Sequence, residues 1–434
     1  MKLKKLLIAS LSILFIFIIA ACSDSDTSSG DSGDSGDSGD KGEKITLNFW
    51  LFGATGYEEL AKEYEKQHDN IEIKIKTSET ADHHNNLFTA LSAGSGAPDI
   101  AALELDQLDR FRDAQDRFVN LYDMGADEIK GEYLDWKWEI AENDNGEFLM
   151  GLPTDIGPKG LYYRLDVFEE AGLPTDPEEV SALVATTEDF KNVALQIKEK
   201  TGKPMVASME MMYRAQLDAL EESYFDKDGK LLIGESGNGV KEAYDLAIEM
   251  NELGLVGNYA MWSAEWANGV DNGDFAVELG AAWFKGWMES NAPEATGEFN
   301  IATLPTEYSG NWGGSYISIP KETEHAEEAY EFVQWLVSPE NQLNSFKSNG
   351  LFPSAPAVYD MEEFTAASDD YFGGQSTQTV FAESAQKIGM VYKGKDYTSV
   401  HDEILAALVN SQAGADPEKE WKEAIKRIET KLDR

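Results

Sequence analysis

Residues 45–76 have the sequence ITLNFWLFGATGYEELAKEYEKQHDNIEIKIK, and this stretch decides the fold. Its first eight residues are mostly apolar, which is typical of a buried strand. Its middle has the apolar spacing of one helical face, at Tyr57, Leu60, Ala61 and Tyr64. Its last six residues alternate isoleucine with a charged residue, the period of a half-exposed strand. Strand, helix and strand in this order predict a parallel unit.

The same alternation continues toward the C-terminus. Residues 84–94 (HNNLFTALSAG) predict a helix that ends at Gly94, and residues 98–105 (PDIAALEL) predict a third strand. In open α/β sheets, ligands bind at the carboxyl ends of the parallel strands. This rule directs attention to the side chains at the ends of the first and third strands: Trp50, Phe52, Glu104 and Asp106.

Chain length and charge restrict the architecture and the partners. About 390 residues follow the N-terminal region, more than one average domain holds, so we expect two domains. Without residues 1–21 the chain has 33 basic against 80 acidic residues, a net charge of −47. Nucleic acid and anionic membranes are poor partners for such a surface. The acidity suits a saline or alkaline habitat, and simple solubility explains it equally well.

The N-terminal region predicts export. Lysines precede a nearly apolar run at 6–21, which is too short to span a membrane and ends in small residues, so residues 1–21 are predicted to be a signal peptide. Ile19-Ala20-Ala21-Cys22 resembles the lipobox of bacterial lipoproteins and includes the only cysteine of the chain. Cys22 is therefore predicted to be lipidated, and residues 22–44, rich in Asp, Ser and Gly, to form a disordered tether. A plain secreted protein with an incidental cysteine is the alternative.

Several further motifs occur in an order that resembles the extracellular solute-binding proteins of bacterial ABC importers, of the sugar-binding, family 1 type. They are ITLNFW (45–50), LSAGSGAPDI (91–100), GLPTDIGPKGLYYRLDVFEEAGL (151–173), FAVELGAAWFKGW (275–287), FNIATLPT (299–306), GGSYISIPKETEHAEEAYEFVQWL (313–336) and GLFPS (350–354). The resemblance implies an α/β, two-lobed periplasmic-binding-protein-like fold of type II. Each lobe is expected to be a mainly parallel sheet flanked by helices, and hinge segments are expected to join the lobes.

The resemblance also implies boundaries, partners and location. Lobe I is expected at 45–156 and 314–356, and lobe II at 157–313 and 357–434, with crossings near 154–160, 312–316 and 352–357. The implied partners are a carbohydrate ligand, with an oligosaccharide favoured by the many aromatic residues, and the permease subunits of an ABC transporter. The protein is expected to be a monomer, to use no cofactor or metal, to bind no nucleic acid, and to contact the membrane only through its lipid anchor. Its expected location is the extracellular face of a Gram-positive type cell membrane.

A sugar site needs two kinds of side chain, because a pyranose ring has apolar C–H faces and a belt of hydroxyl groups. Aromatic rings stack on the faces, and carboxylates, amides and guanidinium groups bond the hydroxyls. Glycines beside such groups let a ligand approach the backbone. With the resemblance, this reasoning predicts the following ligand-binding residues: Trp50, Phe52, Glu104, Asp155, Trp283, Trp287, Trp312, Gly313, Tyr371 and Phe372.

Each of these candidates has a structural alternative. Trp50 could pack in the core, and Glu104 could cap a helix. Trp283 and Trp287 are four residues apart, and we expect one of them to be core and Trp287 to face the ligand. Two more tryptophans are also four apart, on an expected helix, and are interpreted as core: Trp262 and Trp266.

Arg214 and Tyr224 are two further possible contacts to the ligand. Among all the candidates, Trp312 is the one that we favour most as a ligand-binding residue.

The sequence does not favour an enzyme. Its five histidines form no HExxH pattern, and neither GxSxG nor a Walker motif occurs. We therefore assign no catalytic residue and expect binding without chemistry. A secreted glycoside hydrolase, or another carbohydrate-active surface protein, is the alternative, because that chemistry needs only two carboxylates across a sugar cleft. A third class is an adhesin or cell-wall structural protein, which would lack a small-molecule site.

Overall fold

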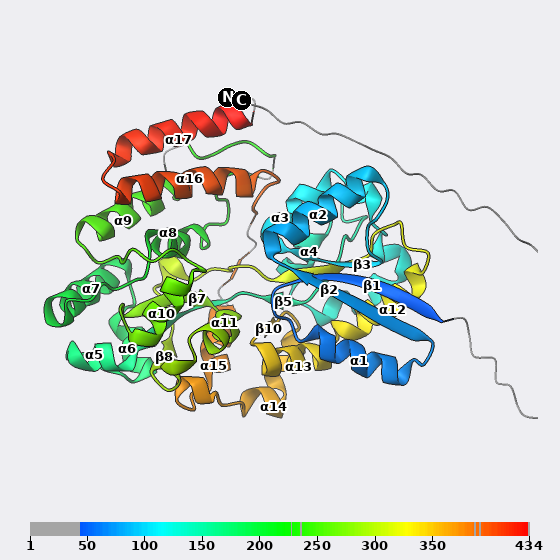
Figure 1. Ribbon diagram of the computed structural model, residues 1–434, viewed down its shortest axis with the longest axis horizontal. Helices are drawn as coiled ribbons and strands as arrows, with labels where there is room; N and C mark the ends of the chain where they lie inside the picture. Colours follow the sequence, from blue (N-terminus) through cyan, green and yellow to red (C-terminus); the bar gives the residue numbers. More distant parts are fainter. Residues whose placement is uncertain (1–43, 227, 235–236, 386–387, 390–391, 433–434) are drawn as a thin grey trace, which may run out of the picture. The chain divides into compact units, whose positions relative to one another are not determined.

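Strands β1 (Ile45–Phe52) and β2 (Ile71–Ser78) lie parallel along their whole length in the computed structural model, with Ile45 opposite Ile71 (Figure 1). Helix α1 (Tyr57–Gln67) connects them and buries the four residues predicted to share its inner face. The predicted strand–helix–strand unit is therefore confirmed. The structure describes residues 44–226, 228–234, 237–385, 388–389 and 392–432.

Cys22, the predicted signal peptide and all of the predicted tether except Lys44 lie outside the described residues. Among the described helices, none combines the length and the apolar character needed to cross a membrane.

The first sheet has five strands in the order β2-β1-β3-β9-β4. Strand β3 (Ile100–Glu104) runs parallel to β1, but β9 (Ser315–Ser318) runs antiparallel to both β3 and β4 (Leu152–Pro153). The sheet is thus mixed. Strand β9 follows a chain crossing and pairs with two strands that are far from it in the sequence, so no strand–helix–strand unit determines its direction.

The second sheet corrects the sequence prediction more strongly. Its central strand β6 (Lys159–Arg164) is antiparallel to both neighbours, β7 (Val277–Ala281) and β8 (Phe299–Ala302). The expectation of a mainly parallel sheet in each lobe is therefore wrong for this sheet. Strand β6 enters straight from the first crossing, so its direction depends on the route of the chain and not on a βαβ unit.

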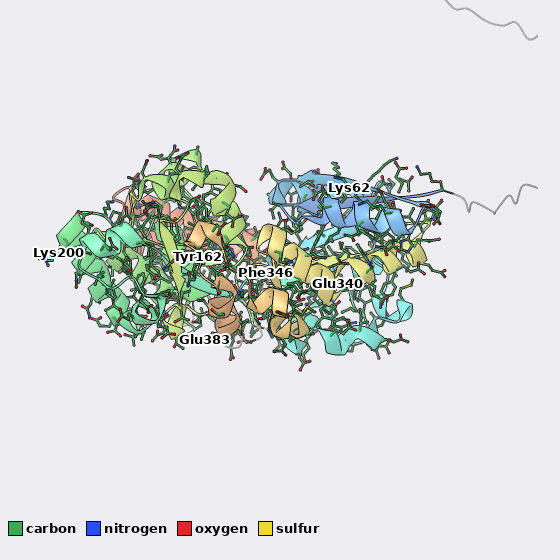
Figure 2. The ribbon with its side chains drawn as sticks, turned by 90° about the horizontal axis from the view of Figure 1, so that it is seen from below. Lys62, Tyr162, Lys200, Glu340, Phe346 and Glu383 are labelled. Atoms are coloured by element: carbon green, nitrogen blue, oxygen red, sulfur yellow. The ribbon has the colours of Figure 1, made fainter. Side chains whose placement is uncertain are left out.

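Helices cover both sheets, and α16 and α17 pack against each other (Figure 1). Figure 2 shows Tyr162 of β6 within packed side chains and Lys200 at their outside. The helices other than α1 are α2 (Thr80–Ala93), α3 (Leu105–Arg112), α4 (Asp135–Ala141), α5 (Leu165–Glu170), α6 (Pro177–Leu183), α7 (Thr187–Thr201), α8 (Met209–Leu217), α9 (Val240–Glu252), α10 (Ala264–Asn272), α11 (Phe284–Asn291), α12 (Ala326–Leu336), α13 (Pro339–Asn349), α14 (Glu362–Thr365), α15 (Thr377–Ala385), α16 (Tyr397–Gln412) and α17 (Pro417–Lys431).

The segments expected to cross between the lobes lie beside one another. Short strands β5 (Asp155–Ile156) and β10 (Phe352–Pro353) pair antiparallel, and the Trp312 N–H donates to the carbonyl of Gly157 at 2.9 Å. Residues 43–434 are held together as one unit, so the division at residues 157, 314 and 357 stays a prediction.

Candidate ligand-binding site

Four tryptophan side chains from separate parts of the sequence meet at the second crossing. We call Trp262, Trp283, Trp287 and Trp312 the tryptophan cluster. The ring of Trp262 lies about 6 Å from each of the other three, and the rings of Trp283 and Trp312 lie 5.1 Å apart. Trp262 is 49% exposed, whereas Trp312 is only 7% exposed. The cluster therefore has a buried floor and an outer ring open to solvent.

Trp262 is a member of the tryptophan cluster that sequence reasoning missed. It was expected on a helix together with Trp266, but α10 begins after it, at Ala264, where the Ser263 hydroxyl caps the N–H of Trp266. Trp262 has a left-handed backbone (φ 67°), an unfavourable conformation for a bulky residue that often marks functional sites. The expectation of a core role is wrong for Trp262, whose ring is half exposed, and confirmed for Trp266, which is fully buried.

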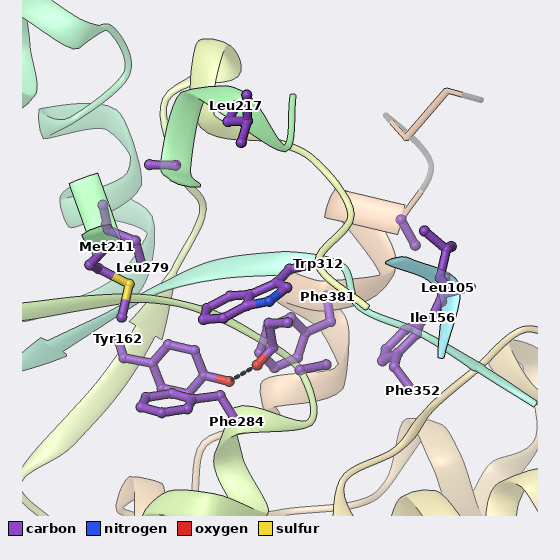
Figure 3. Packing of buried hydrophobic residues seen from close by; sticks show 14 of the residues in the cluster. Leu105, Ile156, Tyr162, Met211, Leu217, Leu279, Phe284, Trp312, Phe352 and Phe381 are labelled. Atoms are coloured by element: carbon purple, nitrogen blue, oxygen red, sulfur yellow. Dashed lines mark hydrogen bonds between the residues drawn. The ribbon is translucent and has the colours of Figure 1, made fainter. Parts of the chain in front are cut away.

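Trp283 and Trp287 both reach the cluster from α11, and both are half buried. The Trp283 Nε1–H donates to the Trp312 carbonyl at 2.7 Å, which fixes the floor of the cluster. A side chain at Gly313 (φ 81°) would strain the backbone, although its Cβ would make only ordinary van der Waals contact with Trp283 and with Oε1 of Glu104, at 3.7 Å. The glycine is therefore required by the backbone conformation at this end of the crossing. Figure 3 shows Trp312 among the buried residues around it.

A group of buried charges lies against the other side of Trp312. We call Arg214, Asp106, Asp218 and Lys393 the ionic network. The Arg214 guanidinium lies 4.6 Å from the centroid of the Trp312 ring. It also pairs with Asp106 at 3.3 Å and with Asp218 at 3.7 Å. Lys393 reaches the same two carboxylates, at 3.4 and 3.3 Å. Asp106 was a candidate because it follows the end of the third predicted strand, and in the structure its carboxylate pairs with Arg214.

The electrostatics of the network follow from burial and pairing. Burial alone would raise the pKa of Asp218, but the charges of Arg214 and Lys393 outweigh it and lower that pKa to about 2. Burial, and next the charge of Asp106, raise the pKa of Glu104 well above its usual range. Within the described residues, three buried atoms of the network have no hydrogen-bond partner: Asp106 Oδ1, Arg214 Nε and Asp218 Oδ2. Each of them nevertheless faces an opposite charge: Asp106 Oδ1 lies 3.4 Å from the Lys393 ammonium, and Arg214 Nε lies 3.7 Å from Asp218 Oδ2.

A histidine of α16 and a tyrosine from the segment between α8 and α9 support the network. His401 Nε2 accepts from Arg214 at 3.0 Å, and His401 Nδ1 lies 2.8 Å from the hydroxyl of Tyr224. Burial, followed by the Arg214 charge, lowers the pKa of His401, so the ring is neutral and can accept at Nε2. Tyr224, a possible ligand contact from the sequence, is fully buried and acts on Arg214 through this histidine.

The predicted residues of β1 and β3 lie at their strand ends with close neighbours. The Lys76 ammonium lies 4.5 Å from the Trp50 ring centroid. Phe52 packs against both histidines of α2, at 5.3 Å from His83 and 5.0 Å from His84. The Glu104 N–H donates to His84 Nε2 at 3.0 Å, and this bond holds the end of β3.

The remaining predicted residues lie inside the protein. Asp155 accepts from the Thr154 hydroxyl at 2.7 Å and from the Ser315 N–H at 3.0 Å, so it joins two crossing segments. Tyr371 donates to the Ala292 carbonyl at 2.7 Å, and Phe372 is fully buried. Asp155, Tyr371 and Phe372 are thus buried, and their role as ligand contacts stays a prediction.

A groove of about 840 Å³ runs beside the ionic network. It is lined by α3, by residues 139–146, and by two loops at 225–229 and 392–396, apart from residue 227. Seven of its lining residues are acidic and three are basic, which disfavours an anionic ligand there. On the same side, the Asp109 carboxylate accepts from the Gly394 N–H at 2.7 Å.

Comparisons with known proteins identify the family. The model of the bacterial extracellular solute-binding protein family matches residues 53–343. The chain belongs to this family. It is 26% identical over 416 residues to an arabinooligosaccharide-binding protein of Bacillus subtilis (strain 168), with 90% of each chain covered. A crystal structure of an extracellular solute-binding protein of family 1 is 30% identical, has a TM-score of 0.80, and covers 88% of this chain and 98% of its own.

A third relative has a bound sugar. It is an ABC transporter-associated binding protein of B. animalis subsp. lactis Bl-04 in complex with β-1,6-galactobiose, with 23% identity, a TM-score of 0.73, and coverage of 90% of this solute-binding protein and 98% of the neighbour. The structural neighbours confirm the expected two-lobed fold of type II. The family resemblance that the motifs predicted is likewise confirmed.

Proposed function

We propose that the protein binds a neutral oligosaccharide outside the cell and delivers it to an ABC importer. The observation that carries this proposal is the tryptophan cluster lying directly against the ionic network, where Arg214 of the network lies over the ring of Trp312 of the cluster. Such a site offers the apolar faces and the charged hydrogen-bonding groups that a sugar needs. Two of the relatives carry saccharides in their names, an arabinooligosaccharide and a galactobiose.

The aromatic half of the site would stack on the sugar rings. Trp262, Trp283 and Trp287 are the accessible rings, and we assign them the ligand faces. Trp312 and Gly313 form the floor. We regard Trp50 and Phe52 as a possible extension of the site from the end of β1, and Asp155, Tyr371 and Phe372 as its support.

The polar half would bond the hydroxyl groups. Arg214 can donate, and Asp106 and Glu104 can accept, from positions beside Trp312 and Gly313. Because these groups are already desolvated, a hydrogen bond from a sugar to them is strong, and a missing hydroxyl is costly. The acidic groove beside the network would exclude uronates and phosphorylated sugars.

Delivery would follow from hinge closure. A ligand held by one lobe adds contacts to the other and shifts the open–closed equilibrium. The closed form then presents both lobes to the permease subunits. The protein would act as a monomer, held by acyl chains on Cys22 at the outer face of the membrane.

The anchor has its own test. Cys22→Ser removes the only thiol, so the variant is expected in the culture medium or unprocessed in the membrane with its signal peptide. Detergent phase partitioning of the mature protein measures this. A mature Cys22→Ser protein that partitions like the wild type would exclude lipidation at this residue.

The binding proposal is tested by calorimetric titration with arabinotriose, β-1,6-galactobiose, maltotriose and a galacturonate trimer. We expect binding of one of the neutral sugars and none of the uronate. Trp262→Ala should weaken that binding, and Trp335→Phe, a half-buried tryptophan on α12, serves as the matched control. The same mixtures analysed for hydrolysis products test the glycoside hydrolase alternative: released monosaccharide would overturn binding without chemistry.

A further inference from the structure

A second layer of aromatic rings lies behind the tryptophan cluster. Its central member, Trp266, stacks on Trp287 with ring centroids 4.3 Å apart, and on Phe284 at 5.4 Å. It also meets Trp262 edge-on at 5.1 Å. Trp266 is fully buried and so cannot stack on a ligand itself, but it contacts two of the rings to which we assign that role. Any change in the position of Trp266 is therefore passed to the ligand face.

A carboxyl group holds Trp266 in place. The Trp266 Nε1–H donates to Oε1 of Glu278, which lies on β7 opposite Tyr162 of β6 and is 0% exposed. The other oxygen, Oε2, is buried, and within the described part of the chain it has no hydrogen-bond partner. A glutamate in the middle of a buried apolar strand is costly when it is ionised, because one hydrogen bond replaces a full hydration shell.

The titratable residues on the elements around Glu278 have partners other than this carboxyl group. On β6 the Tyr162 hydroxyl donates to the Ala281 carbonyl, Lys159 pairs with Asp218 at 3.7 Å, and Arg164 pairs with Asp166 at 2.8 Å. On α11 the Lys285 ammonium is paired with Asp369. The other charged residues of α8, α10 and α11 are Glu210, Arg214, Glu265, Asp271 and Glu289.

The pKa of Glu278 reflects this isolation. Burial raises that pKa to about 8, the hydrogen bond from Trp266 lowers it in part, and no charged group of the neighbouring elements has a resolved effect on it within the described residues. The carboxyl group is thus mostly protonated at neutral pH and ionises within the alkaline range in which the folded protein can be studied.

We propose that Glu278 is a positioning residue for the ligand site, and that its neutral carboxyl group fixes Trp266 and through it Trp287 and Trp262. Ionisation places a charge in the apolar layer, which draws in water or displaces the Trp266 ring, and the ligand face loses its arrangement. Ligand affinity is therefore controlled by alkaline pH. The inference rests on the proposed function, because it assigns the ligand face to the tryptophan cluster.

The decisive variant is Glu278→Gln, which keeps the shape and the carbonyl oxygen that accepts from Trp266 but cannot ionise. Affinity for arabinotriose is measured from pH 6 to pH 9.5. In the wild type we expect a fall of about tenfold by about pH 9, one unit above the pKa of about 8, and in Glu278→Gln a change of less than about twofold. Equal pH profiles in the two proteins would overturn the proposal, since a purely structural glutamate changes stability and not this profile.

A measurement without ligand separates this inference from the proposed function. The near-ultraviolet circular dichroism of the tryptophans, followed over the same pH range, should show a transition with a midpoint near 8 in the wild type that is absent from Glu278→Gln. If arabinotriose fails to bind at any pH, the choice of ligand is wrong, and the spectroscopic titration still decides the role of Glu278. Absence of the transition in the wild type would overturn that role.

Discussion

Trp312 separates two regions of opposite chemistry. On one side the tryptophan cluster leaves apolar surface open, with Trp262 half exposed at its rim. On the other side the ionic network buries two cations and two carboxylates that pair with one another. Within the described chain, no side chain covers the open aromatic surface, whereas most charges of the network are paired with an opposite charge. This difference predicts that changes at the accessible rings of the cluster, Trp262, Trp283 and Trp287, mainly affect ligand binding, and that changes in the network mainly affect folding.

The energetics of the two regions differ for the same reason. A buried ion pair contributes little net stability over a hydrophobic substitute, but removal of one partner leaves an uncompensated buried charge and costs several kcal/mol. An exposed aromatic ring that is truncated costs little stability, because it was never fully removed from water. Mutations on the two sides of Trp312 can therefore break or sharpen the comparison.

The largest effect is expected for Arg214→Met. Among the described residues, Lys393 is then the one cation that still pairs with both Asp106 and Asp218, and Lys159 lies 3.7 Å from Asp218 alone. Because part of the buried negative charge then has no partner, the free energy of unfolding should fall by about 3–5 kcal/mol. Urea denaturation at neutral pH measures it. A loss below about 1 kcal/mol would contradict the view that the network is held by mutual pairing.

Trp312→Ala should have a similar or slightly smaller effect on folding. The ring is almost fully buried between Arg214 and Trp283, and its truncation leaves a cavity that costs about 3–5 kcal/mol. Affinity should fall as well, because the floor of the cluster is lost. A melt and a titration on the same variant measure both: unchanged stability with weakened binding would show instead that Trp312 faces the ligand directly.

The pH dependence of the network has a definite sign. The folded-state pKa of Asp218, about 2, lies below its usual value of 3.8, so its contribution to stability is present above about pH 4 and is lost as the pH falls toward 2. The contribution is about 2 kcal/mol. We expect the stability difference between the wild type and Asp218→Asn to shrink by roughly two thirds of this amount between pH 5 and pH 2.5 in urea titrations. A constant difference would mean that the pairing is not electrostatic.

Sequence reasoning found the elements that depend on local patterns. The apolar period of residues 45–76 predicted β1, α1 and β2, because each of these elements buries one face that its own spacing defines. The sequence did not predict that β6 and β9 run antiparallel to their neighbours. The direction of these strands depends on the route that the chain takes between the lobes, which no local pattern encodes.

The candidate site was predictable only in part, and for a related reason. Trp283, Trp287 and Trp312 occur in motifs that mark the crossings, and the structure brings them together. No local pattern signals that Arg214 meets Asp106, which is 108 residues away. The same holds for Trp262, whose left-handed backbone is imposed by its surroundings and not by its residue type.

Trp262→Ala tests the aromatic side of the comparison. The loss of one stacking ring should weaken sugar binding by roughly 5- to 150-fold, equal to about 1–3 kcal/mol, while the midpoint of urea denaturation should change little because the ring is 49% exposed. The variant keeps a Cβ atom at the positive φ, so the backbone strain at this position stays the same. A large loss of stability with unchanged affinity would place Trp262 with the structural residues.

The smallest effect is expected where a charge pair of the same type lies at the surface. Lys395 pairs with Asp113 at 3.1 Å, close in the chain to Lys393, but both side chains are more than half exposed. Water already solvates each charge, and salt screens their attraction, so Lys395→Met should change the free energy of unfolding by no more than about 0.5 kcal/mol. The pair therefore serves as the exposed control for Arg214→Met, because each variant removes a cation that pairs with an aspartate of α3 or of its C-terminal end, once with burial and once without. If the two variants lose equal stability in urea, burial of the ionic network is not the cause of the loss.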